Sequence, residues 1–367
     1  MERNSKKILI VFGTRPEVIK LAPVIKALED EGLRYSMLIV NTNQHSELLE
    51  EHVRFWNLEI DFTFQINRTD YNLTSLLTQS LDQLQNVVDK HPKIEYLITQ
   101  GDTNTALTCA HISYFNKLKL LHIESGLRTN ELYSPFPEEF NRVVASLVAH
   151  HHFAPTKQNQ ENLLSLGVEP NSISVVGNTI VDALKYAKEQ IGNKKIQVKD
   201  RVLITMHRRE NSILDYENLV RNIRILKLHL PHLSFNWISH PSNFELINSL
   251  TDAYPEIEVL NHLNYLDFIK LYDYCPLVIT DSGGVTEEAV QLGIPIIVYR
   301  EHTERIEPIN TGYPFLVSKD EQDILDFSIE NTSKTFTPGE FYNGKETSKH
   351  IALWIKNKFQ ITPSTPL

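Results

Sequence analysis

The chain has 367 residues, 41% of them hydrophobic and 22% charged, a composition typical of globular proteins with a buried core. Its formal net charge of −10 argues against non-specific binding to nucleic acid. Two cysteines are too few for a disulfide framework. No apolar run approaches the ~18 residues of a membrane span, and residues 1–7 lack the apolar core of a signal peptide, so we expect a cytoplasmic protein.

The first half of the chain alternates short apolar runs with amphipathic stretches. The runs are unbroken by polar residues, as in strands that are buried on both faces. The expected strands are 8–12, 37–40, 96–99 and 120–123, and the expected helices between them are 16–29, 73–88 and 138–149. This alternation predicts a parallel sheet with helices on both faces.

A polar stretch near residues 191–200 interrupts the pattern, which then restarts. Further apolar runs cover 202–205, 235–238, 257–260, 277–280 and 295–298. We therefore predict an α/β protein with two Rossmann-like domains, 1–190 and 191–345, and a closing helix and tail over 346–367. Ligands of open α/β sheets bind beyond the carboxyl ends of the strands, so we expect the site in a cleft between the domains.

The turn after the first expected strand has features of an anion site. Gly13 permits a tight turn, and Pro16 suits the first turn of a helix. Arg15 stands at that helix N-terminus, which favours anions, and Lys20 lies one turn further on. The alternative is a capped surface turn with solvated charges.

Three carboxylates follow strands or begin a helix in the first half: Asp102, Glu124 and Glu138. Asp102 alone could be a helix cap, and Glu138 could complement a helix dipole. Clustered carboxylates, however, have pKa values that split into an acid and a base, which favours catalysis. No G-x-G-x-x-G or P-loop motif follows any strand, so we expect neither a dinucleotide enzyme nor a P-loop ATPase.

The second half carries a complementary basic and glycine-rich set. His207 opens a charged run after a strand, and Ser282, Gly283 and Gly284 offer backbone N–H groups to a diphosphate at a helix N-terminus. The run His150–His152 does not predict a metal site, because consecutive side chains do not share a helix face.

Taken together, these strings resemble the non-hydrolysing UDP-N-acetylglucosamine 2-epimerases. Nine strings match in the family's order: Gly13–Glu17, Gly101–Thr103, His122–Thr129, Pro137–Arg142, Phe153–Thr156, Gly177–Thr179, His207–Asn211, Thr280–Gly284 and Thr303–Arg305. The resemblance implies a glycosyltransferase-B-like fold, a homodimer, and reversible conversion of UDP-GlcNAc to UDP-ManNAc for surface polysaccharides. It implies that UDP leaves to give a glycal and adds back, without a redox cofactor or metal.

The resemblance also assigns roles to residues. Asp102, Glu124 and Glu138 take the acid/base roles, and Arg15 and His207 hold the diphosphate with the amides of Ser282–Gly284. Glu288 binds the ribose hydroxyls, Phe268 lies against the uracil, and Lys20 and Arg305 complete the expected substrate contacts.

The chain departs from the family's pattern at several positions. Ser125 replaces the usual alanine, Thr286 a glutamine, Ile306 a proline, and Asn343–Lys345 a Gly-Asp-Gly sequence. Many members bind an activating UDP-GlcNAc through a segment that contains two glutamines. In this chain the segment is Gln44–Glu47, and Glu47 replaces the second glutamine. A retaining glycosyltransferase, a hydrolysing epimerase and a nucleotide-sugar sensor stay open as alternatives.

Overall fold

The computed structural model describes residues 7–44, 46–67, 72–192, 199–208, 211–240, 243–261, 263–305, 307–309, 311–338, 342 and 346–360. The chain forms two compact units, Met1–Ala183 with Tyr342–Leu367, and Leu184–Phe341. The division falls within α7 (Ile180–Ile191), upstream of the polar stretch that suggested a boundary. His45, Arg209, Glu210, Ile306 and Asn343–Lys345 lie outside the described residues.

The first unit is built on a parallel sheet in the order β3-β2-β1-β4-β5-β6-β7. Its strands are β1 (Ile8–Phe12), β2 (Met37–Asn41), β3 (Phe62–Thr63), β4 (Tyr96–Gln100), β5 (Lys119–Ile123), β6 (His151–Ala154) and β7 (Ile173–Val175). The central strand β1 is fully buried, and its Ile8 is in register with Met37 of β2 and Tyr96 of β4. The strand order reverses between β1 and β4, which creates a topological switch point.

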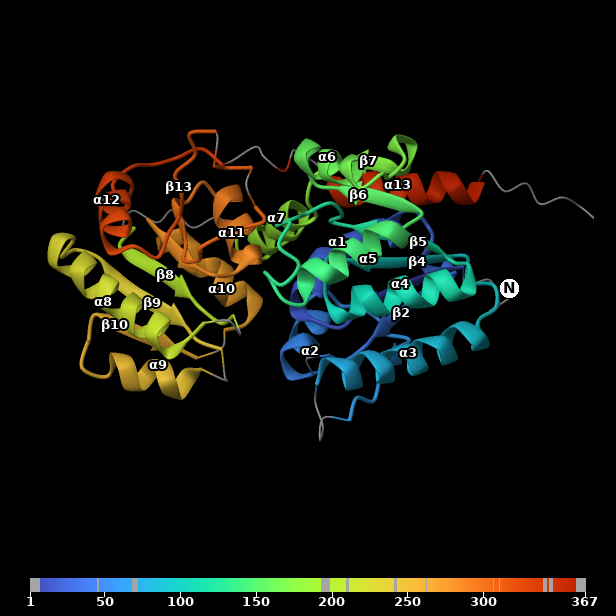
Figure 1. Cartoon of the computed structure of the whole chain (residues 1–367), viewed down its shortest axis with the longest axis horizontal. Coiled ribbons are helices and arrows are strands. Elements are labelled where there is room, and N and C mark those ends of the chain that lie inside the picture. The colour runs from blue at the N-terminus through green and yellow to red at the C-terminus, as the bar shows by residue number, and fades with distance from the viewer. Residues whose placement is uncertain are drawn as a thin grey trace, which may run out of the picture. The chain divides into compact units, whose positions relative to one another are not determined.

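Helices of the first unit form two groups of neighbours. One group contains α3 (Leu73–Lys90), α4 (Asn104–Asn116) and α5 (Glu138–Val148), which pack in sequence. The other contains α1 (Arg15–Asp30), α2 (Ser46–Phe55) and the C-terminal α13 (Thr347–Gln360), which packs on α1. The helix α6 (Lys157–Ser165) lies beside β6 and β7 (Figure 1).

The helix α13 belongs to the first unit, although it follows the whole second unit in sequence. Its Lys356 Nζ donates to Glu31 Oε2 at 2.6 Å, and its Trp354 ring stacks on His151 of β6 at 4.1 Å between centroids. Its first residue, Thr347, donates through Oγ1 to the carbonyl oxygen of Val176 at 2.9 Å. The first unit is therefore assembled from both ends of the sequence.

The second unit repeats the same plan with the parallel strand order β10-β9-β8-β11-β12-β13. Its strands are β8 (Arg201–Thr205), β9 (Ser234–Ile238), β10 (Ile257–Leu260), β11 (Val278–Thr280), β12 (Ile296–Val298) and β13 (Phe315–Val317). Its helices are α8 (Ile213–His229), α9 (Phe244–Thr251), α10 (Tyr265–Leu271), α11 (Gly283–Gln291) and α12 (Glu321–Asn331). Here the order reverses between β8 and β11.

The predicted α/β class with two parallel sheets is confirmed. Four strands were not predicted from the sequence: β3, β6, β7 and β13. Three of them are short with partly exposed residues, and β6 begins with two histidines, so none shows a long apolar run. The two cysteines, Cys109 and Cys275, are free and buried. None of the helices in the described ranges is long and apolar enough to cross a membrane.

Candidate active site

In the first unit, the expected site residues lie at the carboxyl ends of the central strands. The loops after β1 and β4 flank the switch point, where ligands of such sheets bind, and the loop after β5 is the next along. Gly13 after β1 tolerates no side chain, because a Cβ there would lie 1.9 Å from Thr42 Oγ1. The entry to α1 is thus packed tightly against the neighbouring strand, and half-buried Arg15 is the first residue of that helix.

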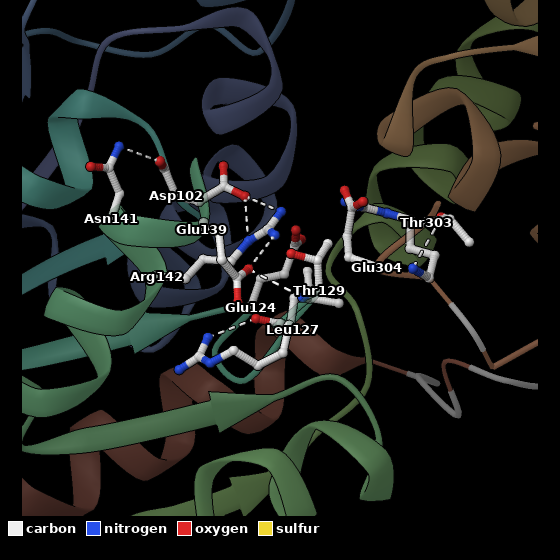
Figure 2. A network of polar contacts seen from close by, with 12 residues as sticks. Asp102, Glu124, Leu127, Thr129, Glu139, Asn141, Arg142, Thr303 and Glu304 are labelled. Atoms are coloured by element: carbon white, nitrogen blue, oxygen red, sulfur yellow. Dashed lines mark hydrogen bonds and ion pairs between the residues drawn. The ribbon is translucent and has the colours of Figure 1, made fainter. Parts of the chain in front are cut away.

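Asp102 after β4 is held by Arg142 of α5. Two nitrogens of Arg142, Nε at 2.8 Å and Nη2 at 2.5 Å, contact Asp102 Oδ2. Asn141 Nδ2 donates to the Asp102 carbonyl oxygen at 2.8 Å, so the backbone is held as well (Figure 2). The guanidinium is buried, whereas 22% of the Asp102 side chain is exposed. Asp102 is therefore a fixed carboxylate that a ligand can reach.

Glu139, the neighbour of the predicted Glu138, is the residue that completes this network. Its Oε2 accepts from Arg142 Nη1 at 3.1 Å, and its carboxylate also accepts from the backbone N–H groups of Thr129 and Asn130 (Figure 2). Glu138 itself is the half-buried first residue of α5. Glu139 and Arg142 were missed from the sequence, although their i, i+3 spacing on a helix is a recognisable signal of an ion pair.

Glu124 after β5 pairs with Lys20 of α1. The Lys20 ammonium donates to Glu124 Oε2, and both side chains are at most 5% exposed. Glu124 also has a left-handed backbone with φ of 61°, which costs a non-glycine residue about 1 kcal/mol or more. Such strain is typical of functional positions. Lys20, expected to bind an anion, holds a carboxylate in this structure.

Two buried histidines, His122 and His152, lie in the neighbouring strands β5 and β6. His122 Nε2 donates to the carbonyl oxygen of Gly101 at 2.7 Å, and burial lowers the pKa of His122 to about 4. His152 Nδ1 lies 2.9 Å from Ser125 Oγ, and burial lowers the pKa of His152 to about 3. Among the described residues no group of three or more His, Cys, Asp or Glu side chains could hold a metal ion.

In the second unit, Asp281 organises the two loops at the switch point. Its side chain is fully buried, and its Oδ2 accepts from the N–H groups of His207 and Arg208 at 2.8 and 2.9 Å and from Asn211 Nδ2 at 2.7 Å. His207 Nδ1 lies 3.4 Å from Asp281 Oδ1, and 42% of the His207 side chain is exposed. The loop after β8 is thereby tied to the loop after β11. This role of Asp281 was not predicted from the sequence, where Asp281 was noted only within the string Thr280–Gly284.

Arg305 supports the glycine turn at the start of α11. Its Nε donates to Glu287 Oε1 at 2.9 Å, and its Nη1 donates to Glu304. A Cβ on Gly283 would lie 2.4 Å from Arg305 Cζ, so the guanidinium packs against that glycine. Ser282 and Gly284 are half-buried beside it. Arg305, expected as a ligand, is 6% exposed and engaged by two carboxylates.

Two further expected residues, Phe268 and Glu288, meet at Tyr272. Tyr272 donates through its hydroxyl to Glu288 Oε2 at 2.7 Å, and Tyr265 donates to Oε1 at 3.3 Å. The half-buried Phe268 ring lies edge-on to Tyr272, with 5.4 Å between centroids. Burial, with Glu288 nearby, raises the pKa of Tyr272 well above its usual range, so its hydroxyl stays a donor.

Comparison with known families decides the relationship of this chain. A sequence model of one family, described as UDP-N-acetylglucosamine 2-epimerase, matches residues 26–356. The chain belongs to the UDP-N-acetylglucosamine 2-epimerase family. The match includes Asp102, Glu124, Glu138, His207 and Glu288.

Members of this epimerase family match over almost the full length. A UDP-N-acetylglucosamine 2-epimerase of Campylobacter jejuni is 34% identical over 96% of this chain and 98% of its own. The crystal structure of the Neisseria meningitidis enzyme bound to UDP-GlcNAc has a TM-score of 0.89 at 31% identity, covering 96% of this chain and all of that one. The Methanocaldococcus jannaschii enzyme in complex with UDP-GlcNAc and UDP has a TM-score of 0.86 at 30% identity, covering 96% and 99%. The expected glycosyltransferase-B-like fold is confirmed by these similarities.

Proposed function

We propose that this protein is a non-hydrolysing UDP-GlcNAc 2-epimerase, which interconverts UDP-GlcNAc and UDP-ManNAc. The proposal rests on the position of Asp102, a partly exposed carboxylate that Arg142 holds in place. Asp102 follows β4, and Glu124, with its left-handed backbone, follows the neighbouring strand β5. The Neisseria meningitidis relative was solved with UDP-GlcNAc bound, which supports the same substrate here.

The residue types fit the chemistry that such a reaction requires. The C2 proton of the sugar is not adjacent to a carbonyl, so direct deprotonation is too slow. If the C1–O bond to UDP breaks first, C1 becomes cation-like and the C2 proton becomes acidic. A carboxylate then takes the C2 proton, leaving a glycal and UDP. Return of a proton to the opposite face of C2 and re-addition of UDP to C1 give the epimer, with no net oxidation.

In this proposal, Asp102, Glu124 and Glu138 supply the acid and base. Asp102 is held in place by a buried guanidinium, while part of its own side chain stays exposed to a ligand. Glu124 is buried with Lys20 as its partner, an arrangement in which a carboxylate and an ammonium balance each other's charge in a dry environment.

The departing diphosphate is held by cations and backbone N–H groups. We assign this role to Arg15, His207 and the first turn of α11, Ser282–Gly284, where the helix dipole favours an anion. Glu288 binds the ribose hydroxyls and Phe268 lies against the uracil. We place the product in the synthesis of surface polysaccharides and the protein in a homodimer.

One experiment separates this proposal from its rivals. The protein is incubated with UDP-GlcNAc alone in D₂O, and the products are followed by NMR. UDP-ManNAc carrying deuterium at C2 supports the proposal. Free sugar would point to a hydrolysing enzyme, and absence of turnover would overturn the assignment of UDP-GlcNAc as the substrate.

A further inference from the structure

Glu17 is a buried carboxylate for which the proposed chemistry has no use. It lies in the first turn of α1, and only 1% of the residue is exposed. Its Oε2 accepts from the N–H groups of Gly13 and Thr14, at 3.0 and 2.8 Å, and from Thr14 Oγ1 at 2.9 Å. Its Oε1 accepts from Thr103 Oγ1 at 2.7 Å. Four donors therefore converge on one carboxylate.

Helix capping explains only part of this arrangement. The bond from the Thr14 N–H is that of a capping box, in which a helix's own N3 glutamate closes its first turn. Thr103, however, lies 86 residues away, in the loop after β4. Its hydroxyl also accepts from the Thr105 N–H at 3.1 Å as the cap of α4. Glu17 is thus bonded to the starts of two helices.

The two loops joined by Glu17 are the ones that flank the switch point of the first unit. One loop continues from Thr14 directly into Arg15, and the other passes through Asp102 directly into Thr103. A shift of Thr14 or Thr103 by a fraction of an ångström would move the proposed diphosphate ligand or the proposed base, and catalysis is sensitive to such shifts.

We propose that Glu17 is a positioning residue, which ties the loop after β1 to the loop after β4 and so fixes the relative places of Arg15 and Asp102. This inference rests on the proposed epimerase function for its kinetic consequence, but the tie between the loops can be measured independently of activity.

The second unit provides a control carboxylate. Asp215 is also the N3 residue of a capping box, with Ser212 at the start of α8. Its side chain is 19% exposed and pairs with Lys319. Asp215→Asn therefore removes the charge of an ordinary capping box, whereas Glu17→Gln removes the charge of the carboxylate that joins two loops.

The titration of the Glu17 carboxylate should appear in the pH profile of kcat. A residue with a purely structural role would not change that profile. Burial raises the pKa of Glu17 to about 7, against the opposing effect of its four donors. The groups that face it are Gly13 and Thr14 of its own loop, Thr103, and Cys109 of α4, whose thiol pKa burial raises above its usual range. A proton on Glu17 would displace one of the four donors, so all four bonds form only above about pH 7, even though the buried charge lowers the stability of the whole fold there.

The kinetic test compares Glu17→Gln, Thr103→Val, Thr103→Ser and Asp215→Asn in the epimerase assay. We expect Glu17→Gln to lower kcat on the order of tenfold and to flatten the acidic limb of the kcat profile near pH 7. Thr103→Val should do the same, and Thr103→Ser should keep the wild-type profile. The loss of kcat in the Glu17→Gln/Thr103→Val double variant should be smaller than the product of the two single losses, because both variants disrupt the bond between Glu17 and Thr103. A Glu17→Gln enzyme with wild-type kcat and profile, or single effects that multiply, would overturn the proposal.

The second test does not depend on turnover. Amide hydrogen exchange is measured for residues 101–105 in the wild type, Glu17→Gln and Asp215→Asn. We expect exchange in this distant loop to quicken about tenfold or more in Glu17→Gln alone, because the bond that ties Thr103 to α1 is weakened. Unchanged exchange in Glu17→Gln overturns the proposal. If the wild-type protein does not epimerise UDP-GlcNAc while this exchange result holds, the proposed function fails and the positioning role stands.

Discussion

Arg142 contacts a single oxygen of Asp102 through two nitrogens, Nε at 2.8 Å and Nη2 at 2.5 Å. This geometry needs the flat guanidinium and cannot be reproduced by a lysine. We predict that Arg142→Lys lowers kcat about 100-fold, because the carboxylate loses its orientation, while UDP affinity measured by calorimetry changes less than about threefold. A lysine variant with wild-type kcat would show that the double contact is not required.

Asp102→Asn removes the proposed base but preserves its shape. We expect C2 deuterium exchange in D₂O to fall by about 100- to 10,000-fold, because an amide cannot take up the proton. UDP should still bind, which calorimetry on the same sample would verify. Full exchange in this variant would remove Asp102 from the mechanism.

Asp281→Asn tests the organisation of the second unit. The amide that replaces the carboxylate carries no charge, so its oxygen is a weaker acceptor for the N–H donors of His207 and Arg208. We expect UDP affinity to weaken about tenfold, as a buried bond to a charged acceptor is worth roughly 1.5–3 kcal/mol. Asp326→Asn is the matched control, since Asp326 is exposed and accepts a hydrogen bond from Gln322 of its own helix. Equal UDP affinity in both variants would contradict the assignment.

The two glycines at the start of α11 form a natural pair. A Cβ on Gly283 would meet the buried Arg305 guanidinium, whereas one on Gly284 would meet no atom within 4 Å. Gly283→Ala should therefore lower the free energy of unfolding by about 1–3 kcal/mol, and Gly284→Ala should leave it equal or raise it by up to about 1 kcal/mol. Chemical denaturation of both variants distinguishes these outcomes, and a Gly283→Ala protein as stable as the wild type would show that Arg305 moves aside freely.

We predict that Glu17 makes the free energy of unfolding depend on pH with a sign opposite to that expected for most carboxylates. Its pKa is raised from 4.5 to about 7, so the folded state binds its proton more tightly than the unfolded state. The stability from this proton is fully present below pH 4.5 and is lost as the pH rises through about 7. The free energy of unfolding of the wild type, relative to that of Glu17→Gln, should thus fall by up to about 3 kcal/mol as the pH rises from 4.5 to about 7.

For Asp215 we expect a pH dependence of stability with the opposite sign to that of Glu17. Partial burial acts to raise its pKa, but the hydrogen bonds from Lys319 and Ser212 together outweigh burial and lower the pKa below 3.8. Its contribution to stability is therefore present above the unfolded pKa and is lost as the pH falls. Thermal unfolding of the wild type, Glu17→Gln and Asp215→Asn between about pH 2 and 8 should show the two trends diverging. The advantage in stability over Glu17→Gln falls as the pH rises through about 7, whereas the advantage over Asp215→Asn falls as the pH drops below about 4. Parallel trends would mean that the Glu17 pKa is not raised.

The sequence alone allowed the central strands to be predicted, because β1, β4 and β8 each contain an apolar run of buried residues. It also placed Asp102 and Glu124 at strand ends, since strand ends follow directly from the runs. The partners of these carboxylates could not be predicted in the same way. Lys20 lies 104 residues from Glu124, and only the folded sheet brings them together.

The carboxylate partners of Lys20 and Arg305 are a second feature that could not be predicted from the sequence, and their roles as substrate ligands stay predictions. Basic residues near glycine turns suggest anion ligands, but both side chains are buried and engaged by carboxylates. Whether a basic residue faces a ligand or balances an internal charge depends on side-chain direction, and residue spacing does not determine that direction.

The packing of α13 on α1 affects the order in which the two units can fold during synthesis. The side of α1 that α13 covers stays exposed until residues 347–360 have been synthesised, since this helix is the last element of the first unit to leave the ribosome. The second unit, which is continuous over Leu184–Phe341, has all of its residues available earlier. The part of the protein encoded second is therefore the first that can finish folding.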